Sequence, residues 1–220
     1  MKIIDCDQRS PEWFAERSLR ATASELGNLI SPTLVIREGS MPQTYRCKKL
    51  AERWIGRPII GYSGGAMEQG SILEDEAIPW YELRHKRDVR RVGLVISDDG
   101  LLSASPDGLS DDRGLEIKCP QEHTHVSWLL DGGCPPEHFL QVQGGMYATG
   151  LEEWDFVSYC RAMPPLVVRV KRDQKAQEAI ELAVQTFDQL MRADWDKLTS
   201  MYGQPDTAPT IEMPEDGLVF

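Results

Sequence analysis

The sequence lacks the features of a membrane-spanning or exported protein. No segment approaches the roughly 18 consecutive apolar residues that a membrane span requires, and the apolar segment 92–102 is interrupted by glycine, serine and aspartate. The N-terminal residues MKIIDC contain one lysine and no apolar run long enough for a signal peptide. We therefore expect a cytosolic protein without membrane contact.

Cysteine is sparse and has no paired spacing. The chain has 5 cysteines, an odd number, with no C-x-x-C motif. His123 and His125 are close in sequence but have no third ligand nearby. This pattern argues against a disulfide framework and against a zinc site, so we expect reduced thiols.

Positive charge is also scarce. Lys and Arg number 24 against 35 Asp and Glu, which gives a net charge of −11, so any contact with nucleic acid must be local. Residues 84–91 form the most basic run, which fits either a DNA-tracking surface or a solvated helix end. A second basic segment, 46–57, is a weaker indication because Tyr45 and Trp54 have the spacing of core residues.

The 220 residues, of which 41% are hydrophobic, suffice for one domain with a sizeable core. Apolar periodicity and turn residues predict two short N-terminal helices, the second opened by a capping box at Thr22, followed by helices, strands and further helices. The longer helices are expected at 42–56, 65–86 (bent at Pro79), 137–149 and 180–191, with a meander of three strands within 88–118 and two more strands at 154–159 and 166–170. The order indicates an α/β fold around a mixed sheet, with a single domain over 1–200 and an extended, acidic, proline-containing tail over 201–220.

The chemically informative segment is Ser-Pro-Asp-Gly at 105–108, followed by Gly-Leu-Glu-Ile-Lys at 114–118. Strand alternation places Glu116 and Lys118 on one face and Ile117 on the other. Asp107 and Glu116 offer the hard oxygen ligands that Mg²⁺ or Mn²⁺ takes, and Lys118 could hold or deprotonate an attacking water. This combination suits phosphodiester hydrolysis.

Each feature alone also has an ordinary structural interpretation. A Pro-Asp-Gly turn and an E-x-K pair on a half-exposed strand are common, and Glu74 lies among other acidic residues that suggest a solvated helix face. Trp128-Leu129-Leu130 and the stripe from Ile180 to Met191 are interpreted as core.

Together, however, these residues resemble the PD-(D/E)xK nuclease superfamily, whose pattern is a Pro-Asp turn, a strand with E-x-K and an acid on the preceding helix, here Glu74. A Q-x-x-x-Y motif from Gln143 to Tyr147 resembles the RecB-type branch. The segments 13–17, 22–25, 115–120 and 141–143 are similar to the phage lambda exonuclease, or YqaJ-type, family, in order over residues 8–198.

This resemblance implies a restriction-endonuclease-like fold with a central mixed β-sheet flanked by α-helices. It implies a 5′→3′ exonuclease that degrades linear double-stranded DNA to mononucleotides and leaves 3′ overhangs for a single-strand annealing protein. It also implies a ring-shaped homotrimer and dependence on Mg²⁺, which Mn²⁺ can replace, with two ions per site.

The resemblance also implies roles for individual residues. Asp107, Glu116, Glu74 and the main-chain carbonyl of Ile117 would hold metal, Lys118 would position water, and Gln143 would support the active site. Arg17, Ser24 and Tyr147, the last in place of a tryptophan, would lie along the DNA phosphates. Two alternatives remain open: an endonuclease of the same superfamily that cuts internally, and a non-catalytic DNA-repair or phage accessory protein, against which the intact Asp107, Glu116 and Lys118 argue.

Overall fold

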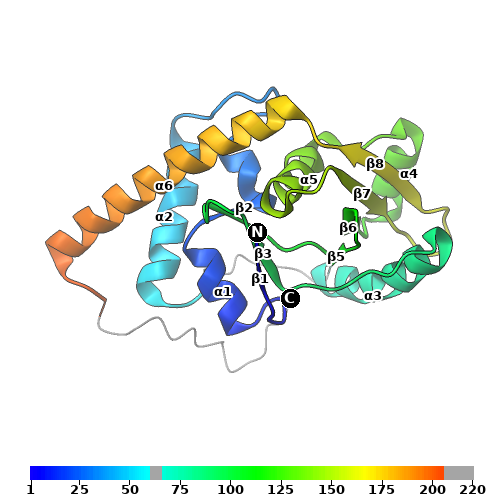
Figure 1. Cartoon of the computed structure of the whole chain (residues 1–220), viewed down its shortest axis with the longest axis horizontal. Helices are drawn as coiled ribbons and strands as arrows, with labels where there is room; N and C mark the ends of the chain where they lie inside the picture. The colour runs from blue at the N-terminus through cyan, green and yellow to red at the C-terminus, as the bar shows by residue number, and fades with distance from the viewer. Residues whose placement is uncertain (60–65, 206–220) are drawn as a thin grey trace.

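The computed structural model describes residues 1–59 and 66–205, with the side chains of 66–72 not included. Two four-stranded sheets lie side by side and are surrounded by helices (Figure 1). The first sheet has the order β1-β3-β4-β2, with strands Lys2–Ile4, Leu94–Ile96, Leu102–Ala104 and Ala21–Thr22. The second has the order β5-β6-β7-β8, with strands Gly108–Leu109, Arg113–Lys118, Glu153–Ser158 and Leu166–Lys171. Both sheets contain parallel and antiparallel pairs, which confirms the expected mixed α/β architecture.

Helices lie around both sheets (Figure 1). They are α1 (Pro11–Ser18), the 3₁₀ helix η1 (Ala23–Asn28), α2 (Ser40–Ile55), α3 (Ala66–His85), α4 (Glu122–Asp131), α5 (Pro136–Thr149) and α6 (Gln174–Tyr202). None of the helices that the structure describes is long and apolar enough to cross a membrane.

The second sheet is the part of the fold that positions the site. Strand β6 runs parallel to β7, and the chain between them forms α4 and α5. Alternation gives β6 two buried faces: Ile117 packs in the cluster that contains Ile78 and Tyr81 of α3, and Glu116 lies on the opposite face with Lys118. The pairing of Glu116 with Phe156 fixes which side chains face α5.

A second core region joins the N-terminal helices to α6. The apolar side of α6, including Ile180, Val184 and Phe187, packs in one cluster with Tyr45 of α2. Rings of Tyr45 and Phe187 stack with centroids 5.0 Å apart. The side chain of Asp173 accepts a hydrogen bond from the Ala176 amide at 2.9 Å and caps the first turn of α6. This packing holds α2 and the residues that precede it against the remainder of the fold.

Most predicted elements are present, but the expected three-stranded meander is wrong. The strands between 88 and 118 divide between the two sheets, because the chain leaves the first sheet after Ala104 and enters the second at Gly108. The capping box at Thr22 opens a 3₁₀ helix rather than an α-helix, and its hydroxyl contacts Glu25 and Tyr45 instead of a backbone amide. Leu130, expected in the core, is 82% exposed. Residue 65, where a helix was expected to begin, and most of the predicted tail, 206–220, lie outside the described residues.

Candidate active site

Asp107 lies in the loop between β4 and β5, against strand β6. Its amide donates to the Leu115 carbonyl at 3.1 Å, and its Oδ2 accepts a hydrogen bond from the Ile117 amide at 2.6 Å. These two bonds hold the Pro-Asp-Gly segment beside the E-x-K strand. The Pro-Asp-Gly segment and the E-x-K strand are therefore in direct contact, as the sequence pattern predicts.

Glu116 and Lys118 project from the same face of β6, as alternation predicts. The Lys118 Nζ lies 2.7 Å from Oε1 of Glu116, whose residue is only 4% exposed. The same carboxylate oxygen accepts a hydrogen bond from Nε2 of Gln141 on α5 at 2.5 Å. Glu116 is thus fixed by a cation from its own strand and an amide from the crossover helix.

Burial and charge set the protonation of this cluster. Burial raises the pKa of Glu116 to about 8, with Lys118 opposing the rise and Asp107 adding to it. Burial acts to lower the pKa of Lys118, but the carboxylates of Glu116 and Asp107 outweigh it, so the net pKa is raised. Lys118 therefore carries a proton at neutral pH. It can donate hydrogen bonds and stabilise negative charge, but it is poorly suited to remove a proton from water.

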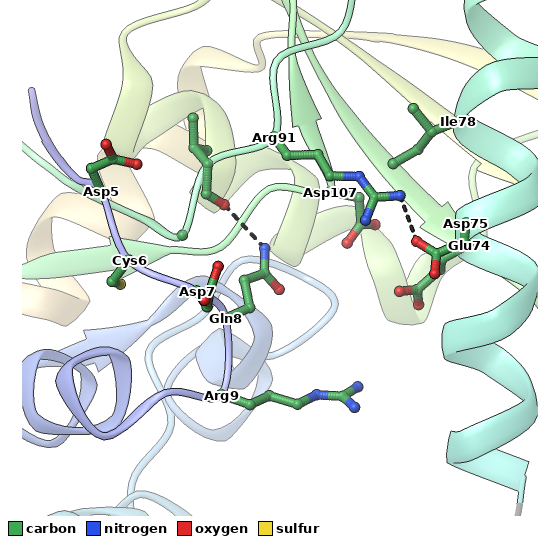
Figure 2. Close-up of a pocket in the computed structure, with 12 residues that line it drawn as sticks. Asp5, Cys6, Asp7, Gln8, Arg9, Glu74, Asp75, Ile78, Arg91 and Asp107 are labelled. Carbon is green, nitrogen blue, oxygen red and sulfur yellow. Dashed lines mark hydrogen bonds and ion pairs between the residues drawn. The ribbon is translucent and has the colours of Figure 1, made fainter.

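Glu74 on α3 faces Asp107 across a cavity of about 640 Å³ (Figure 2). Burial, followed by repulsion from Asp107, raises the pKa of Glu74 to about 7. The loop that follows β1 forms another wall of this cavity. Its lining residues are Asp5, Cys6, Asp7, Gln8, Arg9, Glu74, Asp75, Ile78, Arg91, Val92, Gly93 and Asp107. The helical acid of the sequence motif thus lies on the same cavity as the Pro-Asp turn.

The donor chemistry here fits a hard divalent cation. Asp107, Glu74 and Glu116 come from three separate elements, and their mutual repulsion contributes to the raised pKa of Glu74 and Glu116, an arrangement that a cation would relieve. Among the described residues, no three acidic, histidine or cysteine side chains are grouped closely enough to hold a metal ion as they stand. Glu116 is bound to Lys118 and Gln141, and Asp107 to the Ile117 amide.

Arg17 and Ser24 meet next to Glu116. The guanidinium of Arg17 donates to Oγ of Ser24 and to Oγ of Ser105, both at 3.4 Å, and lies 4.2 Å from the Trp13 ring centroid. Arg17 and Ser24 line a small cavity together with Glu116, whose other lining residues are Ala23, Ala104, Ser105, Pro106, Gln141, Gly145 and Trp154. The structure therefore brings these two predicted phosphate contacts to the acidic cluster.

Gln143 and Tyr147 do not lie in this site. The Gln143 side chain is fully buried, donates to the Lys171 carbonyl at 2.8 Å and accepts from the Asp173 amide at 3.0 Å. The Tyr147 hydroxyl donates to Asp99 at 2.6 Å, in the turn between β3 and β4. The structure does not bring Gln143 to the acidic cluster, because two residues rotate the side chain by about 200° around a helix, so Gln141 faces Glu116 and Gln143 faces away.

Two residues that support Arg17 and the Pro-Asp segment were not predicted from the sequence. Trp13 donates through Nε1 to Oγ of Ser105 at 2.8 Å and to the Gly93 carbonyl at 3.1 Å. Lys49, part of the second basic segment, is 3% exposed and donates to the Arg17 carbonyl at 2.9 Å. The Q-V-Q sequence of 141–143 indicated that a glutamine lies near the site. Which of the two glutamines faces Glu116 depends on the rotation of the helix about its axis.

Several side chains of the two basic segments contact other parts of the molecule. Arg91 bonds to Asp75 at 2.6 Å, and Arg87 bonds to Asp112. In the second segment, Arg46 bonds to Asp194 at 2.6 Å and Arg53 lies 3.8 Å from the Trp195 ring centroid. These contacts favour structural roles for these four arginines.

Comparisons with known proteins find exonucleases of similar structure. The chain is 31% identical to LHK-Exo, an alkaline exonuclease from Laribacter hongkongensis, with a TM-score of 0.77, covering 87% of this chain and 97% of that one. A structure of LHK-Exo in complex with dAMP gives 32% identity and a TM-score of 0.78 over the same shares. A phage-related exonuclease from Haemophilus somnus, at 13% identity and a TM-score of 0.61 over 80% of this chain and 96% of that chain, shares the fold.

An uncharacterised protein of Acanthamoeba polyphaga mimivirus is 29% identical over 171 residues, which are 71% of this chain but only 30% of that protein. The chain thus spans about a third of the length of that curated relative. The model of the YqaJ-like viral recombinase domain matches residues 12–152, a range that includes Arg17, Glu74, Asp107, Glu116, Lys118 and Gln141. Because the matched range covers more than half of the chain, the chain belongs to the YqaJ-like viral recombinase domain family.

Proposed function

We propose that this chain is a metal-dependent exonuclease that degrades linear double-stranded DNA from the 5′ end. One observation carries the proposal: Asp107, Glu116 and protonated Lys118 lie beside a cavity in which Arg17 and Ser24 converge on Glu116. An acidic cluster, a cation for water and an arginine for phosphate are the parts that phosphodiester hydrolysis needs. The similarity to the alkaline exonuclease LHK-Exo supports the same activity.

In the proposed reaction, water attacks phosphorus and the bond from phosphorus to the 3′ oxygen breaks. The 3′ oxygen gains a proton and the terminal nucleotide leaves as a 5′-monophosphate. Lys118, held by Glu116, donates a hydrogen bond that orients the water. Arg17 and Ser24 hold a phosphate at the DNA end.

Asp107, Glu116, Glu74 and the Ile117 carbonyl are the proposed ligands of Mg²⁺ or Mn²⁺, with two ions per site. When bound, the ions would neutralise charge on the phosphate and lower the pKa of water. Gln141 would keep Glu116 in position for this role.

The products and partners form the finer part of the proposal. Mononucleotide release is supported by the dAMP in a related structure, because dAMP is a nucleoside monophosphate. Removal of one strand from the 5′ end leaves a 3′ overhang for a single-strand annealing protein in the cytosol. We further propose a homotrimeric ring that encircles the duplex.

The test is digestion of linear duplex DNA labelled at the 5′ or 3′ end, beside a covalently closed circle, with Mg²⁺ or with EDTA. Lys118→Met is the inactive variant, and Lys48→Met, an exposed lysine on α2 that contacts Glu25, is its matched control. We expect early release of 5′-labelled mononucleotide and an intact circle. We expect no digestion with EDTA or with the Lys118→Met variant. Nicking of the circle would establish an endonuclease instead, and silence of the wild-type protein on every substrate would leave the non-catalytic accessory protein.

A further inference from the structure

Residues 7–10 form a tight turn on the rim of the large cavity. The Ser10 amide donates to the Asp7 carbonyl at 3.1 Å, and Arg9, the third residue of the turn, has a φ of 70°. A turn with a left-handed third residue favours glycine or asparagine, because a side chain with a Cβ is strained there. An arginine at this position therefore strains the backbone and lowers the stability of the turn. Strain of this kind is concentrated at functional sites.

Both neighbours of Arg9 are anchored. The Gln8 Nε2 donates to the Val92 carbonyl at 3.2 Å and to the Pro106 carbonyl at 3.1 Å. Ser10 caps α1 by accepting a hydrogen bond from the Trp13 amide at 3.3 Å. Because Pro106 directly precedes Asp107, the backbone of Arg9 is fixed relative to the candidate metal ligand.

The Arg9 side chain extends into the cavity from the N-terminal loop, toward the side formed by α3 (Figure 2). Its charge acts on Glu74, where it opposes the rise in pKa caused by burial and by Asp107. Among the described lining residues, Arg9 and Arg91 are the two with a permanent positive charge. A phosphate entering this acidic cavity needs a cation near its path.

The position of Arg9 complements that of Arg17. Pro106 lines the small cavity with Arg17, whereas Asp107 lines the large cavity with Arg9. The two arginines therefore line two different cavities, each of which includes one residue of the Pro-Asp turn.

We propose that Arg9 binds a backbone phosphate of the DNA strand in the large cavity, next to the phosphate that is cleaved. The inference rests on the proposed nuclease function and adds a substrate-contacting residue to it. The planar guanidinium suits bidentate binding of phosphate, and the strained turn aims it there. The backbone strain is then retained because it serves binding rather than folding.

Arg9→Gly separates the two roles. Glycine relieves the left-handed strain, so we expect Tm to rise by about 2 °C, while loss of the phosphate contact raises KM for linear duplex about tenfold with kcat within about twofold. Arg9→Ala keeps the strained backbone, so it should show the same rise in KM at an unchanged Tm. Lys175→Ala, an exposed lysine in the first turn of α6 and outside both basic segments, is the control for loss of one charge and should leave KM unchanged.

Salt dependence gives an independent measurement. Equilibrium binding of the duplex, measured with EDTA to prevent cleavage, should show a slope of log K against log salt that is smaller by about one in both Arg9 variants. An active wild-type enzyme whose Arg9→Gly variant keeps the same KM and salt slope would overturn the inference alone. If both Tm and nuclease activity fell in Arg9→Gly, Arg9 would have a structural role, and the inference would also be overturned. Absence of digestion by the wild-type protein would instead remove the proposed function itself.

Discussion

At the scale of single residues, the site depends on which side of β6 and α5 each polar group faces. Glu116 is bound from both elements, by Lys118 at 2.7 Å and Gln141 at 2.5 Å. The acidic groups around Lys118 raise its pKa, which favours the proposed role of a cation over that of a base. That Asp107, Glu116 and Lys118 lie close together was predictable from the motif alone. The identity of the supporting glutamine was not, because it depends on the rotation of one helix relative to one strand.

Gln141 and Gln143 make a matched pair for this distinction. Gln141→Leu removes a hydrogen bond to Glu116, so we expect kcat to fall about tenfold with little loss of stability. Gln143→Leu leaves the Asp173 amide without its partner inside the protein, so it should lower the free energy of unfolding by about 2–3 kcal/mol. Thermal unfolding and single-turnover digestion measure the two effects. The opposite pattern, with activity lost only in Gln143→Leu, would contradict the site described here.

At the scale of secondary-structure elements, long periodic segments were predictable and short ones were not. Helices α2 and α6 have clear apolar periodicity, whereas β2 and β5 have two residues each. Helix α4 was missed because Val126 and Leu130, four residues apart, are both exposed and do not mark an apolar stripe toward the core. The division of the strands into two sheets depends on long-range pairing, such as β1 with β3, that local pattern does not encode.

Contact between β6, β7 and α5 requires glycine at two places. A Cβ at Gly145 of α5 would lie 2.6 Å from the Trp154 ring, and a Cβ at Gly114 of β6 would lie 2.3 Å from it. The indole of Trp154, which is 1% exposed, therefore occupies space between the helix and the strand that only glycine leaves open.

Gly145→Ala tests this contact. Alanine favours a helix interior by about 1 kcal/mol over glycine, but overpacking against Trp154 costs about 1–3 kcal/mol and displaces the turn that carries Gln141. We expect a lower Tm and reduced nuclease activity. Gly133→Ala, where a Cβ meets no atom within 4 Å, should change neither, and a stabilised Gly145→Ala protein would disprove the packing argument.

At the scale of the whole molecule, stability should decrease in mild acid through His138. Its ring stacks on Phe156 with centroids 5.5 Å apart and meets Trp128 edge-on at 5.4 Å. Burial, with a smaller effect of Lys118, lowers the pKa of His138 to about 4, against 6.5 for an unperturbed histidine. Between these values unfolding lets the ring of His138 bind a proton, so the contribution of His138 to stability falls as pH drops from about 6.5 toward 4.

His138→Phe keeps the ring stacking and removes the titration. Because His138 is half-buried, we expect it to account for about 1–2 kcal/mol of the acid-dependent loss in the free energy of unfolding. Urea unfolding at pH 7.0 and pH 4.5 measures this loss. Equal pH dependence in the wild-type and variant proteins would rule out His138 as its source.

Assembly is a second prediction at this scale. A homotrimer of the 24.8 kDa chain has a mass of about 74 kDa, three times that of one subunit, which light scattering after gel filtration can measure. A mass of one subunit at working concentration, in a preparation that still digests DNA, would show that a ring is unnecessary for the activity.

The register of β6 against β7 has a consequence for how this sequence can change over time. Six consecutive pairs, from Arg113 opposite Glu153 to Lys118 opposite Ser158, tie the strands together. An insertion or deletion of one codon within β6 would exchange its two faces and bury Glu116 against α3. Length variation should therefore accumulate at the hairpin before Arg113 and between α4 and α5, and engineered insertions such as an epitope tag are best placed there.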